Sequence, residues 1–306
     1  MVRASIRDTS HRLRTIADIA AARLPPLLVA ARRIAASVTL GSHGRRRAGP
    51  GETFWQFRPY SRDDTPQSID WRQTGKFDVT FVREREWVAA QTVALWCDLS
   101  PSMNYHSSRN LPTKAERATI LALALAELLV DGGERIIHLS ADGRPSRAAS
   151  GRVAVARMAD DLSTTIAHTG TAGTPAPLQF ITPLPRHSTI VLISDFLSPL
   201  EEIAAHIGAL GKHGGAGHLL QVMDPAEESL PFRGRVRFVG LEQEGAAVVE
   251  RTEDARSTYI ARLARHRDGV RQIAEQAGWT FAVHHTDRSP QTALVALHQA
   301  MTSYRR

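Results

Sequence analysis

The sequence predicts an α/β fold with a doubly wound, mainly parallel sheet. From about residue 90 onwards, short apolar runs rich in β-formers alternate with segments of helical character. Two of these runs, residues 92–97 and 189–194, end directly before an aspartate and are predicted to be buried strands. Residues 120–130 are almost uniformly apolar, which predicts a helix covered on all sides. This alternation joins parallel strands through right-handed crossovers.

Residues 1–48 are predicted to form a basic helical arm and linker outside the sheet domain. Their helical character is interrupted at Pro25-Pro26. Residues 1–50 hold ten arginines against Asp8 and Asp18, which gives +8, whereas the whole chain carries +7. Such an arm is either simply solvated or contacts an anionic partner or membrane. We expect its removal to leave the sheet domain folded, because its apolar runs are short and interrupted.

The segments after the arm follow in order. Residues 49–89 are dense in aromatic and charged residues and form a unit that precedes the sheet domain of residues 90–306. A helix is predicted to begin at Thr113, because Thr113-Lys114-Ala115-Glu116 has the pattern of a capping box. The other expected elements are a strand at 135–140, a helix near 153–166, a loop at 169–185, a helix capped by Ser198, a strand at 217–223, a hairpin within 236–251, a helix at 253–278, a strand at 279–284 and a helix after Ser289-Pro290.

Composition excludes several kinds of protein. The single cysteine, Cys97, allows neither an internal disulfide nor a cysteine-based zinc site. No uninterrupted apolar segment approaches the length that spans a bilayer. Charged residues from Asp8 to Asp18 break any candidate signal peptide near the N-terminus. We therefore expect a cytoplasmic protein.

Polar side chains follow the two predicted central strands. Asp98, Ser100 and Ser102 come after the first strand, and Asp195 comes after the second. In open α/β sheets, ligands bind at the edge where the strands' carboxyl ends meet. Because Mg²⁺ prefers oxygen ligands, these residues could supply one side of a metal shell. We expect Asp98 and Asp195 on neighbouring strands, with carboxylates roughly 4–7 Å apart and both serines pointing into the same crevice.

A purely structural role is the alternative for these side chains. Asp98 could accept hydrogen bonds from backbone N–H groups of its own loop, while Ser100 and Ser102 stabilise a turn. A structural role is also expected for Asp70, Trp71 and two adjacent histidines. Asp70 is predicted to pair with a nearby arginine such as Arg58, and Trp71 to pack on the sheet. The neighbouring His284-His285 would point to opposite faces of a strand, which disfavours a metal site there.

The strand-end residues resemble motifs of a known kind of domain. Asp98-Leu99-Ser100-Pro101-Ser102-Met103 resembles the first motif of the metal-ion-dependent adhesion site in von Willebrand factor A domains, and Ser194-Asp195-Phe196 resembles the third. Upstream, three runs resemble the signature of the bacterial domain-of-unknown-function 58 family. They are Arg58-Pro59-Tyr60-Ser61-Arg62-Asp63-Asp64, Ile69-Asp70-Trp71-Arg72 and Phe81-Val82-Arg83-Glu84-Arg85-Glu86.

The similarity extends over roughly residues 49–215 and has departures. Asp63-Asp64 stands where the family usually has Gly-Asp, and Gln67 where it usually has Arg. The middle motif of the adhesion site is a threonine on a separate loop, for which Thr169 and Thr171 lie in the right region, as does Thr174 in the Gly-Thr pair that the motif usually has. The ligand set that the resemblance implies for Mg²⁺ or Mn²⁺ is Asp98, Ser100, Ser102, Thr174 and Asp195.

The resemblance implies a protein-binding module in which the metal bridges to a partner's acidic side chain. Similar proteins are encoded beside MoxR-type AAA+ ATPases, which implies such an ATPase as partner and a role in assembly or maturation of protein complexes. The sequence has no Gly-x-Ser-x-Gly elbow and no P-loop, so we expect no enzyme. Two alternatives stay open: a metal-dependent hydrolase using Asp98 and Asp195, and a scaffold that binds a membrane, or less expectedly nucleic acid, through the basic arm.

Overall fold

The computed structural model describes residues 28–38, 48–61, 64–77, 79–86, 91–141, 143–169, 184–212, 215–242 and 245–303. The chain divides into two compact units. One unit is residues 40–91, and the other, the sheet domain, combines residues 1–39 with residues 92–306.

A five-stranded parallel sheet forms the centre of the sheet domain. The strand order is β4-β3-β5-β6-β9, and every neighbouring pair runs in the same direction. The three central strands are almost completely buried, as expected for a parallel sheet with both faces covered. The predicted doubly wound α/β class is therefore confirmed. The strands are β3 (Thr92–Cys97), β4 (Arg135–Leu139), β5 (Thr189–Ser194), β6 (Gly217–Met223) and β9 (Thr280–His285).

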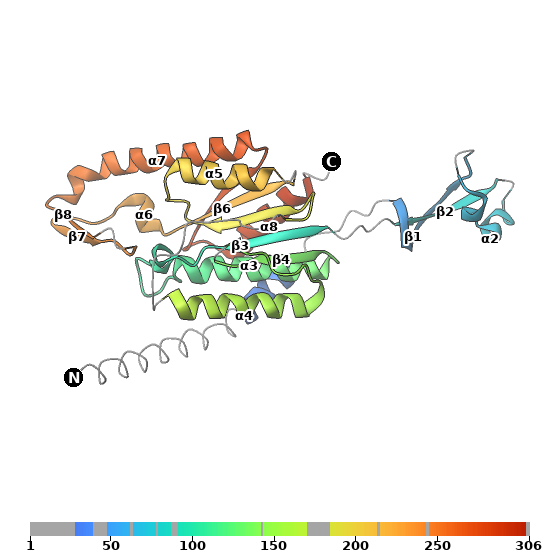
Figure 1. Cartoon of the computed structure of the whole chain (residues 1–306), viewed down its shortest axis with the longest axis horizontal. Coiled ribbons are helices and arrows are strands. Elements are labelled where there is room, and N and C mark those ends of the chain that lie inside the picture. The colour runs from blue at the N-terminus through green and yellow to red at the C-terminus, as the bar shows by residue number, and fades with distance from the viewer. Residues whose placement is uncertain are drawn as a thin grey trace. The chain divides into compact units, whose positions relative to one another are not determined.

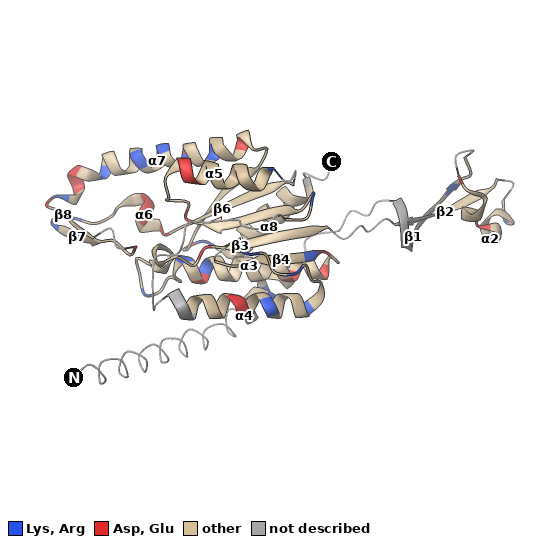
Figure 2. Ribbon diagram, in the orientation of Figure 1, with Lys and Arg blue, Asp and Glu red and all other residues tan. Residues whose placement is uncertain are grey.

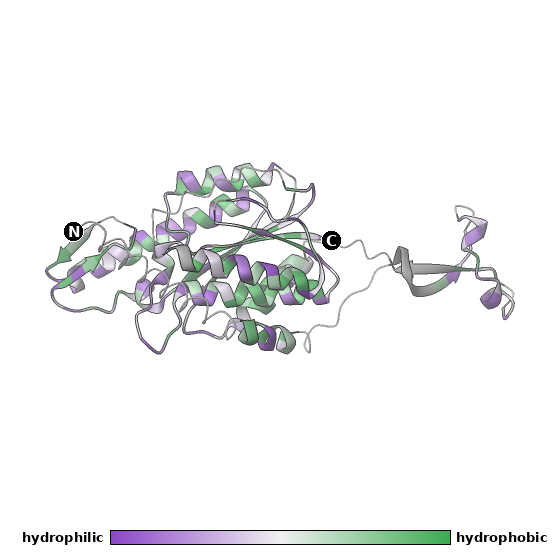
Figure 3. Ribbon diagram, turned by 60° about the horizontal axis from the view of Figure 1, so that its bottom comes forward, coloured by the Kyte–Doolittle hydropathy of each residue, from purple (hydrophilic) through white to green (hydrophobic). Residues whose placement is uncertain are grey.

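Helices cover both faces of this sheet (Figure 1). Val93 and Leu95 of β3 face one helical layer, whereas Ala94 and Trp96 face the other, because successive strand residues point to opposite sides. Figure 3 shows hydrophobic residues on the strands of the central sheet, and Figure 2 shows lysines and arginines along α7. One layer holds α3 (Lys114–Asp131), α4 (Gly151–Thr169) and α8 (Pro290–Ser303), and the other holds α5 (Leu200–Gly211) and α7 (Thr252–Gln276).

The order of the strands creates a switch point between β3 and β5. From β3 the chain moves outward to β4, then crosses back over β3 to β5 and continues in the opposite direction. The connections that leave β3 and β5 therefore diverge, and a crevice opens beyond the carboxyl ends of these two strands. The next residues in the chain are Asp98 and Asp195.

The ends of several helices depend on local sequence. The capping box predicted at the start of α3 is confirmed, with reciprocal bonds between Thr113 and Glu116. The cap predicted at Ser198 is wrong, because α5 begins one residue later than expected and Pro199 stands at its cap position. A second capping box, between Asp224 and Glu227, begins the short helix α6 (Pro225–Ser229).

Residues 28–38 form a helix that belongs to the core of the sheet domain. Ala31, Ile34, Ala35 and Val38 are buried in the same cluster as α3 and α4. Their spacing of i, i+3, i+4 and i+7 places all four on one helix face. For this part of the chain, the expectation of a separate arm up to residue 48 is wrong, because the arm's last helical turns complete the layer beside α3.

The hairpin expected within residues 236–251 is confirmed. Strands β7 (Val236–Val239) and β8 (Ala246–Val249) pair antiparallel, and Gly240 N donates to the carbonyl oxygen of Gly245 at 2.8 Å. The base of the hairpin is fixed to α7, since Thr252 N donates to the carbonyl oxygen of Gly234. The hairpin is largely exposed to solvent.

The smaller unit is a two-stranded antiparallel sheet with short helices. Strands β1 (Ala48–Pro59) and β2 (Phe81–Glu86) pair in it, and η1 (Pro66–Ser68) and α2 (Trp71–Thr74) lie between them in the chain. Arg58 pairs with Asp64, which lowers the pKa of that carboxyl to about 2 through the hydrogen bond from Arg58. The predicted Asp70 to Arg58 pair is therefore wrong: the Asp70 carboxylate instead accepts from Gln73 N and caps α2.

The packing predicted for Trp71 is also wrong. Its side chain is 70% exposed, because it stands at the first position of a helix too short to bury it.

Candidate metal centre

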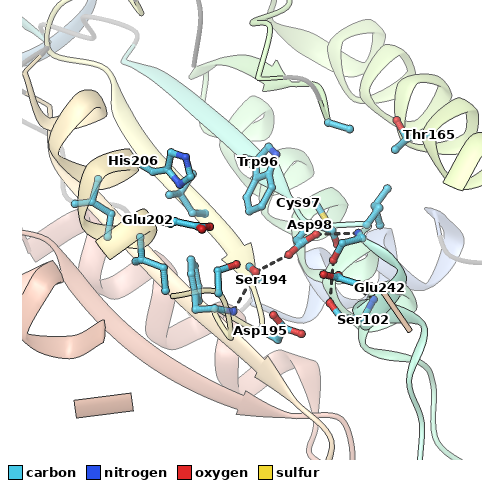
Figure 4. Close-up of a pocket in the computed structure, with 18 residues that line it drawn as sticks. Trp96, Cys97, Asp98, Ser102, Thr165, Ser194, Asp195, Glu202, His206 and Glu242 are labelled. Carbon is cyan, nitrogen blue, oxygen red and sulfur yellow. Dashed lines mark hydrogen bonds between the residues drawn. The ribbon is translucent and has the colours of Figure 1, made fainter. Parts of the chain in front are cut away.

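Hydrogen bonds to β5 and to its own loop hold Asp98 in place. The backbone N–H of Asp98 donates to the Ile193 carbonyl oxygen at 2.8 Å, which continues the β3 to β5 ladder by one residue. Its Oδ1 accepts from Ser100 N at 2.8 Å, and its Oδ2 accepts from the Ser194 hydroxyl at 2.6 Å (Figure 4). These bonds fix the carboxylate at the mouth of the switch-point crevice.

The two serines of the Asp98 loop face one another. Pro101–Asn104 form the 3-10 turn η2, and the residues on either side of Pro101 bring their hydroxyls within 3.0 Å. Ser100 makes no side-chain cap bond to this turn. The hydrogen bond between the two hydroxyls and the bonds of Asp98 within its own loop are compatible with the structural alternative as well as with a metal site.

Asp195 forms a buried ion pair that the sequence analysis did not identify. Its side chain accepts from Lys114 Nζ at 2.9 Å, and the same ammonium donates to Glu227 at 2.6 Å. Lys114 is only 1% exposed and occupies the first turn of α3. Burial lowers the pKa of Lys114, but the charges of Asp195 and Glu227 outweigh burial and leave it raised, so the ammonium stays charged at neutral pH.

The backbone after Asp195 adopts an unusual conformation. Phe196 has φ of 48°, in the left-handed region that a bulky residue rarely adopts. Its ring is buried against α5 and α7, its N–H donates to the Ser194 hydroxyl, and its carbonyl oxygen lies 2.8 Å from His266 Nε2 on α7. Gln221 of β6 donates to the Asp195 carbonyl oxygen at 2.7 Å. Surrounding contacts thus hold a strained backbone at the site.

The electrostatics of the site favour a cation. The pKa of Asp98 is raised, first by burial and then by the negative charge of Asp195, despite the hydrogen bonds from Ser194 and Ser100. Lys114 compensates Asp195 and Glu227, whereas Asp98 forms no ion pair within the part of the chain that the structure describes. An anionic oxygen beside two hydroxyls is the donor set that Mg²⁺ and Mn²⁺ accept, so the residues fit the implied metal.

Four of the five predicted ligands, Asp98, Ser100, Ser102 and Asp195, line one pocket of about 160 Å³. The predicted distance between the carboxylates of Asp98 and Asp195 stays a prediction. Within the described part of the chain, no three His, Cys, Asp or Glu side chains cluster as a metal site, so any shell here depends on the hydroxyls. Thr171 and Thr174 lie outside the described residues, and Thr169 ends α4.

Sequence analysis missed three charged residues at this end of the sheet. Lys114 and Glu227 form the buried ion pair with Asp195, and Glu242 lines the pocket from the β7–β8 hairpin. In the sequence, Lys114 stands out only as an interior position of the predicted capping box, which gives it no role of its own. Glu242 is separated from the motif by 140 residues, and no local pattern marks it.

The sheet domain has a five-stranded parallel sheet that is covered by helices on both faces. Asp-x-Ser-x-Ser follows one central strand, and an aspartate follows the neighbouring strand. These features define a von Willebrand A-like domain. The match of residues 56–269 to the family described as "Protein of unknown function DUF58" extends over more than half of the chain. The chain belongs to this family, as its signature predicted.

Two solved structures are similar to this chain. One is an aerotolerance-related membrane protein from Bacteroides fragilis with multiple mutations to serines, which is 19% identical to this chain and has a TM-score of 0.44. The match covers 70% of this chain and 100% of the Bacteroides fragilis chain. The conserved hypothetical protein BatB from Bacteroides thetaiotaomicron is 17% identical with a TM-score of 0.42 and the same coverage. A search of curated proteins gave no match. No helix in the described ranges is long and apolar enough to cross a membrane.

Proposed function

We propose that this protein binds a partner protein through a divalent cation held at the switch-point crevice. Asp98, Ser100, Ser102 and Asp195 hold Mg²⁺ or Mn²⁺ together with a threonine from the loop after α4. The bound cation supplies a coordination position for an acidic side chain of the partner. Hydroxyl ligands are neutral, so they leave part of the cation's charge available to that side chain.

The observation that carries this proposal is the position of Asp98. It follows β3 directly at the switch point, its carboxylate lies beside a pair of serine hydroxyls, and burial, followed by the charge of Asp195, raises its pKa. A purely structural aspartate has no need of a second acid on the neighbouring strand. The buried Lys114 supports the proposal, because it pairs with Asp195 and not with Asp98, which forms no ion pair among the described residues.

The proposed partner is a MoxR-type AAA+ ATPase from the same organism, acting in assembly or maturation of protein complexes. The family resemblance supports this choice. We propose that the protein acts in the cytoplasm, as a binding module and not as an enzyme, and that its N-terminal arginines leave peripheral contact with an anionic membrane open.

The test measures association between the full chain and that ATPase with Mg²⁺, with Mn²⁺ and with chelator. We expect association that chelator abolishes and that Asp98→Asn abolishes without changing the thermal melting curve. Asp268→Asn is the matched control, since Asp268 is an exposed residue of α7 that pairs with Arg271 one turn later. Unchanged binding by Asp98→Asn would overturn the proposal. Turnover of p-nitrophenyl phosphate that Asp98→Asn abolishes would establish the hydrolase instead.

A further inference from the structure

A buried ammonium lies against one of the predicted metal ligands. Lys114 Nζ donates to Asp195 Oδ2 at 2.9 Å and to Glu227 Oε1 at 2.6 Å, and Lys114 is 1% exposed. The other oxygen of the Asp195 carboxylate accepts from the backbone N–H of Leu197 at 3.3 Å. Both oxygens of Asp195 therefore already accept hydrogen bonds from groups of the chain itself.

Two helix starts hold this ammonium and its second carboxylate in place. Lys114 is the first residue of α3, directly after Thr113, whose capping box with Glu116 fixes the start of that helix. Glu227 lies in the first turn of α6, where it forms a second capping box with Asp224. A buried ammonium is stable only when it is paired in this way, so the arrangement is a built feature of the fold.

The charge of Lys114 opposes a tightly bound metal. Burial lowers the pKa of Lys114, but the charges of Asp195 and Glu227 outweigh burial and leave it raised, so the ammonium stays charged at neutral pH. A metal ion on the same oxygen of Asp195 would lie within about 5 Å of Nζ, because metal–oxygen distances are near 2.1 Å. Solvent ions screen two charges in a buried site poorly, so their repulsion is strong.

The other predicted ligands make the centre sensitive to such a neighbouring charge. Ser100 and Ser102 are neutral, and the part of the chain that the structure describes has no group of three His, Cys, Asp or Glu side chains that could hold a metal. The number of charged ligands is a main determinant of affinity for a divalent cation. With Asp195 engaged by Lys114, Asp98 is the predicted carboxylate ligand that no described cation pairs with.

We propose that Lys114 is a positioning residue that holds Asp195 in place without a metal and keeps the affinity of the centre for its metal low. This inference rests on the proposed function. It adds that metal and partner bind cooperatively, because the partner's carboxylate supplies the negative charge that Lys114 neutralises at Asp195. By linkage, the partner then raises the affinity for the metal by the same factor by which the metal raises the affinity for the partner.

The first test measures Mn²⁺ binding to the full chain by electron paramagnetic resonance. We expect Lys114→Met to bind Mn²⁺ about tenfold more tightly than wild type, because the repulsion disappears and Asp195 is released. Glu227→Gln should bind Mn²⁺ more weakly than wild type, because a negative charge is lost. Lys212→Met is the matched control, with the same substitution at an exposed position. Equal or weaker binding by Lys114→Met would overturn the proposal, since a purely structural lysine gives that result.

A second variant and a melting curve accompany this test, because Lys114→Met loses stability. The double variant Lys114→Met/Glu227→Gln removes one of the two carboxylates that the ammonium balances, and its Mn²⁺ affinity should lie between those of Lys114→Met and wild type. Adding Mn²⁺ should raise the melting temperature of both variants by more than that of wild type, because a tighter ligand stabilises the folded state more. Equal shifts in all three chains would contradict the proposal.

The second test measures the Mn²⁺ affinity of the chain with and without the MoxR-type ATPase. We expect the ATPase to raise the affinity of wild type by more than that of Lys114→Met, and an equal rise in both would overturn the coupling through Lys114. The proposed function fails separately: in that case wild type binds no Mn²⁺ even with the ATPase, and Asp98→Asn behaves like wild type. Mn²⁺ binding that Asp98→Asn loses and Lys114→Met leaves unchanged contradicts only the present inference.

Discussion

The hydroxyl of Ser194, the last residue of β5, donates a hydrogen bond of 2.6 Å to Oδ2 of Asp98, the first residue after β3. This bond joins the two strands at the point where the chain's direction across the sheet reverses. It also orients the Asp98 carboxylate, whose other oxygen accepts from the backbone of its own loop. The third motif therefore contributes two residues to the site: the acid Asp195 and the serine before it.

Replacing Ser194 tests this relationship. Ser194→Ala removes the hydrogen bond that Asp98 Oδ2 accepts, so we expect Mn²⁺ affinity to fall by about 10- to 100-fold, as for other residues that orient metal ligands. Isothermal titration with Mn²⁺ measures the change. Ser198→Ala is the control, because Ser198 lines the same pocket from an exposed position. Equal affinities for the two variants would show that this hydrogen bond does not support the site.

Replacing Lys114 tests the buried ion pair. Lys114→Met leaves Asp195 and Glu227 buried without their cation, so we expect the free energy of unfolding to fall by about 3–5 kcal/mol. Urea denaturation measures the loss, and Lys212→Met, at an exposed position, should change little. The double variant Lys114→Met/Glu227→Gln should recover part of the lost free energy of unfolding, because it removes one of the two buried carboxylates that have no cation. A loss no larger than that of Lys212→Met would contradict the pairing.

The helix at residues 28–38 gives a third prediction. Ile34→Ala should lower the free energy of unfolding of the whole chain by about 2–5 kcal/mol, because Ile34 is buried in the cluster formed with α3 and α4. Val29→Ala on the same helix, where Val29 is 49% exposed, should cost far less. A chain beginning at residue 49 should melt at a lower temperature than the full chain. If it melts at the same temperature, the arm is dispensable as first expected.

Two buried histidines make stability depend on pH. Burial lowers the pKa values of His218 and His284 from 6.5 to about 4. Below pH 6.5 the unfolded chain therefore binds protons that the folded chain refuses. The free energy of unfolding should fall by up to about 1.4 kcal/mol per pH unit for each histidine between pH 6.5 and 4, and stay unaffected by them above pH 6.5.

Urea denaturation at a series of pH values measures this slope. His218→Asn should show a shallower slope than wild type, whereas His187→Asn, at an exposed position, should keep it. Identical slopes in wild type and His218→Asn would contradict the assignment.

The fold and the core of the site could be predicted because their signals are local. Apolar runs ending at Asp98 and Asp195 fix two strand ends, and a parallel sheet brings such ends to one edge. The ion pair of Lys114 could not be predicted in this way. It depends on how the start of α3 meets α6, which lies more than a hundred residues later. The position of Glu242 could not be predicted for the same reason, because its contact with Ser102 joins loops that are distant in the sequence.

Two local features predicted less than the structure shows. Ala31, Ile34, Ala35 and Val38 have the spacing of a buried helix face, but their apolar runs are short and interrupted by Arg32 and Arg33, a pattern that also fits an exposed basic arm. A pair between Asp70 and an arginine is a long-range expectation, whereas Asp70 stands three residues before the backbone N–H of Gln73, whose hydrogen bond it accepts. Local capping competes with long-range pairing, and here the local contact prevails.

The left-handed backbone of Phe196 links the proposed metal centre to the outer helix α7. The ring is buried between α5 and α7, and the carbonyl oxygen is bonded to His266, so both groups keep Phe196 in a conformation costing about 1–3 kcal/mol. Glycine at this position would relieve the strain but leave a void where the ring packs. Substitutions of His266, a residue absent from the pocket, should therefore alter the orientation of Asp195. We therefore expect α7 to tolerate fewer substitutions than its exposure to solvent suggests.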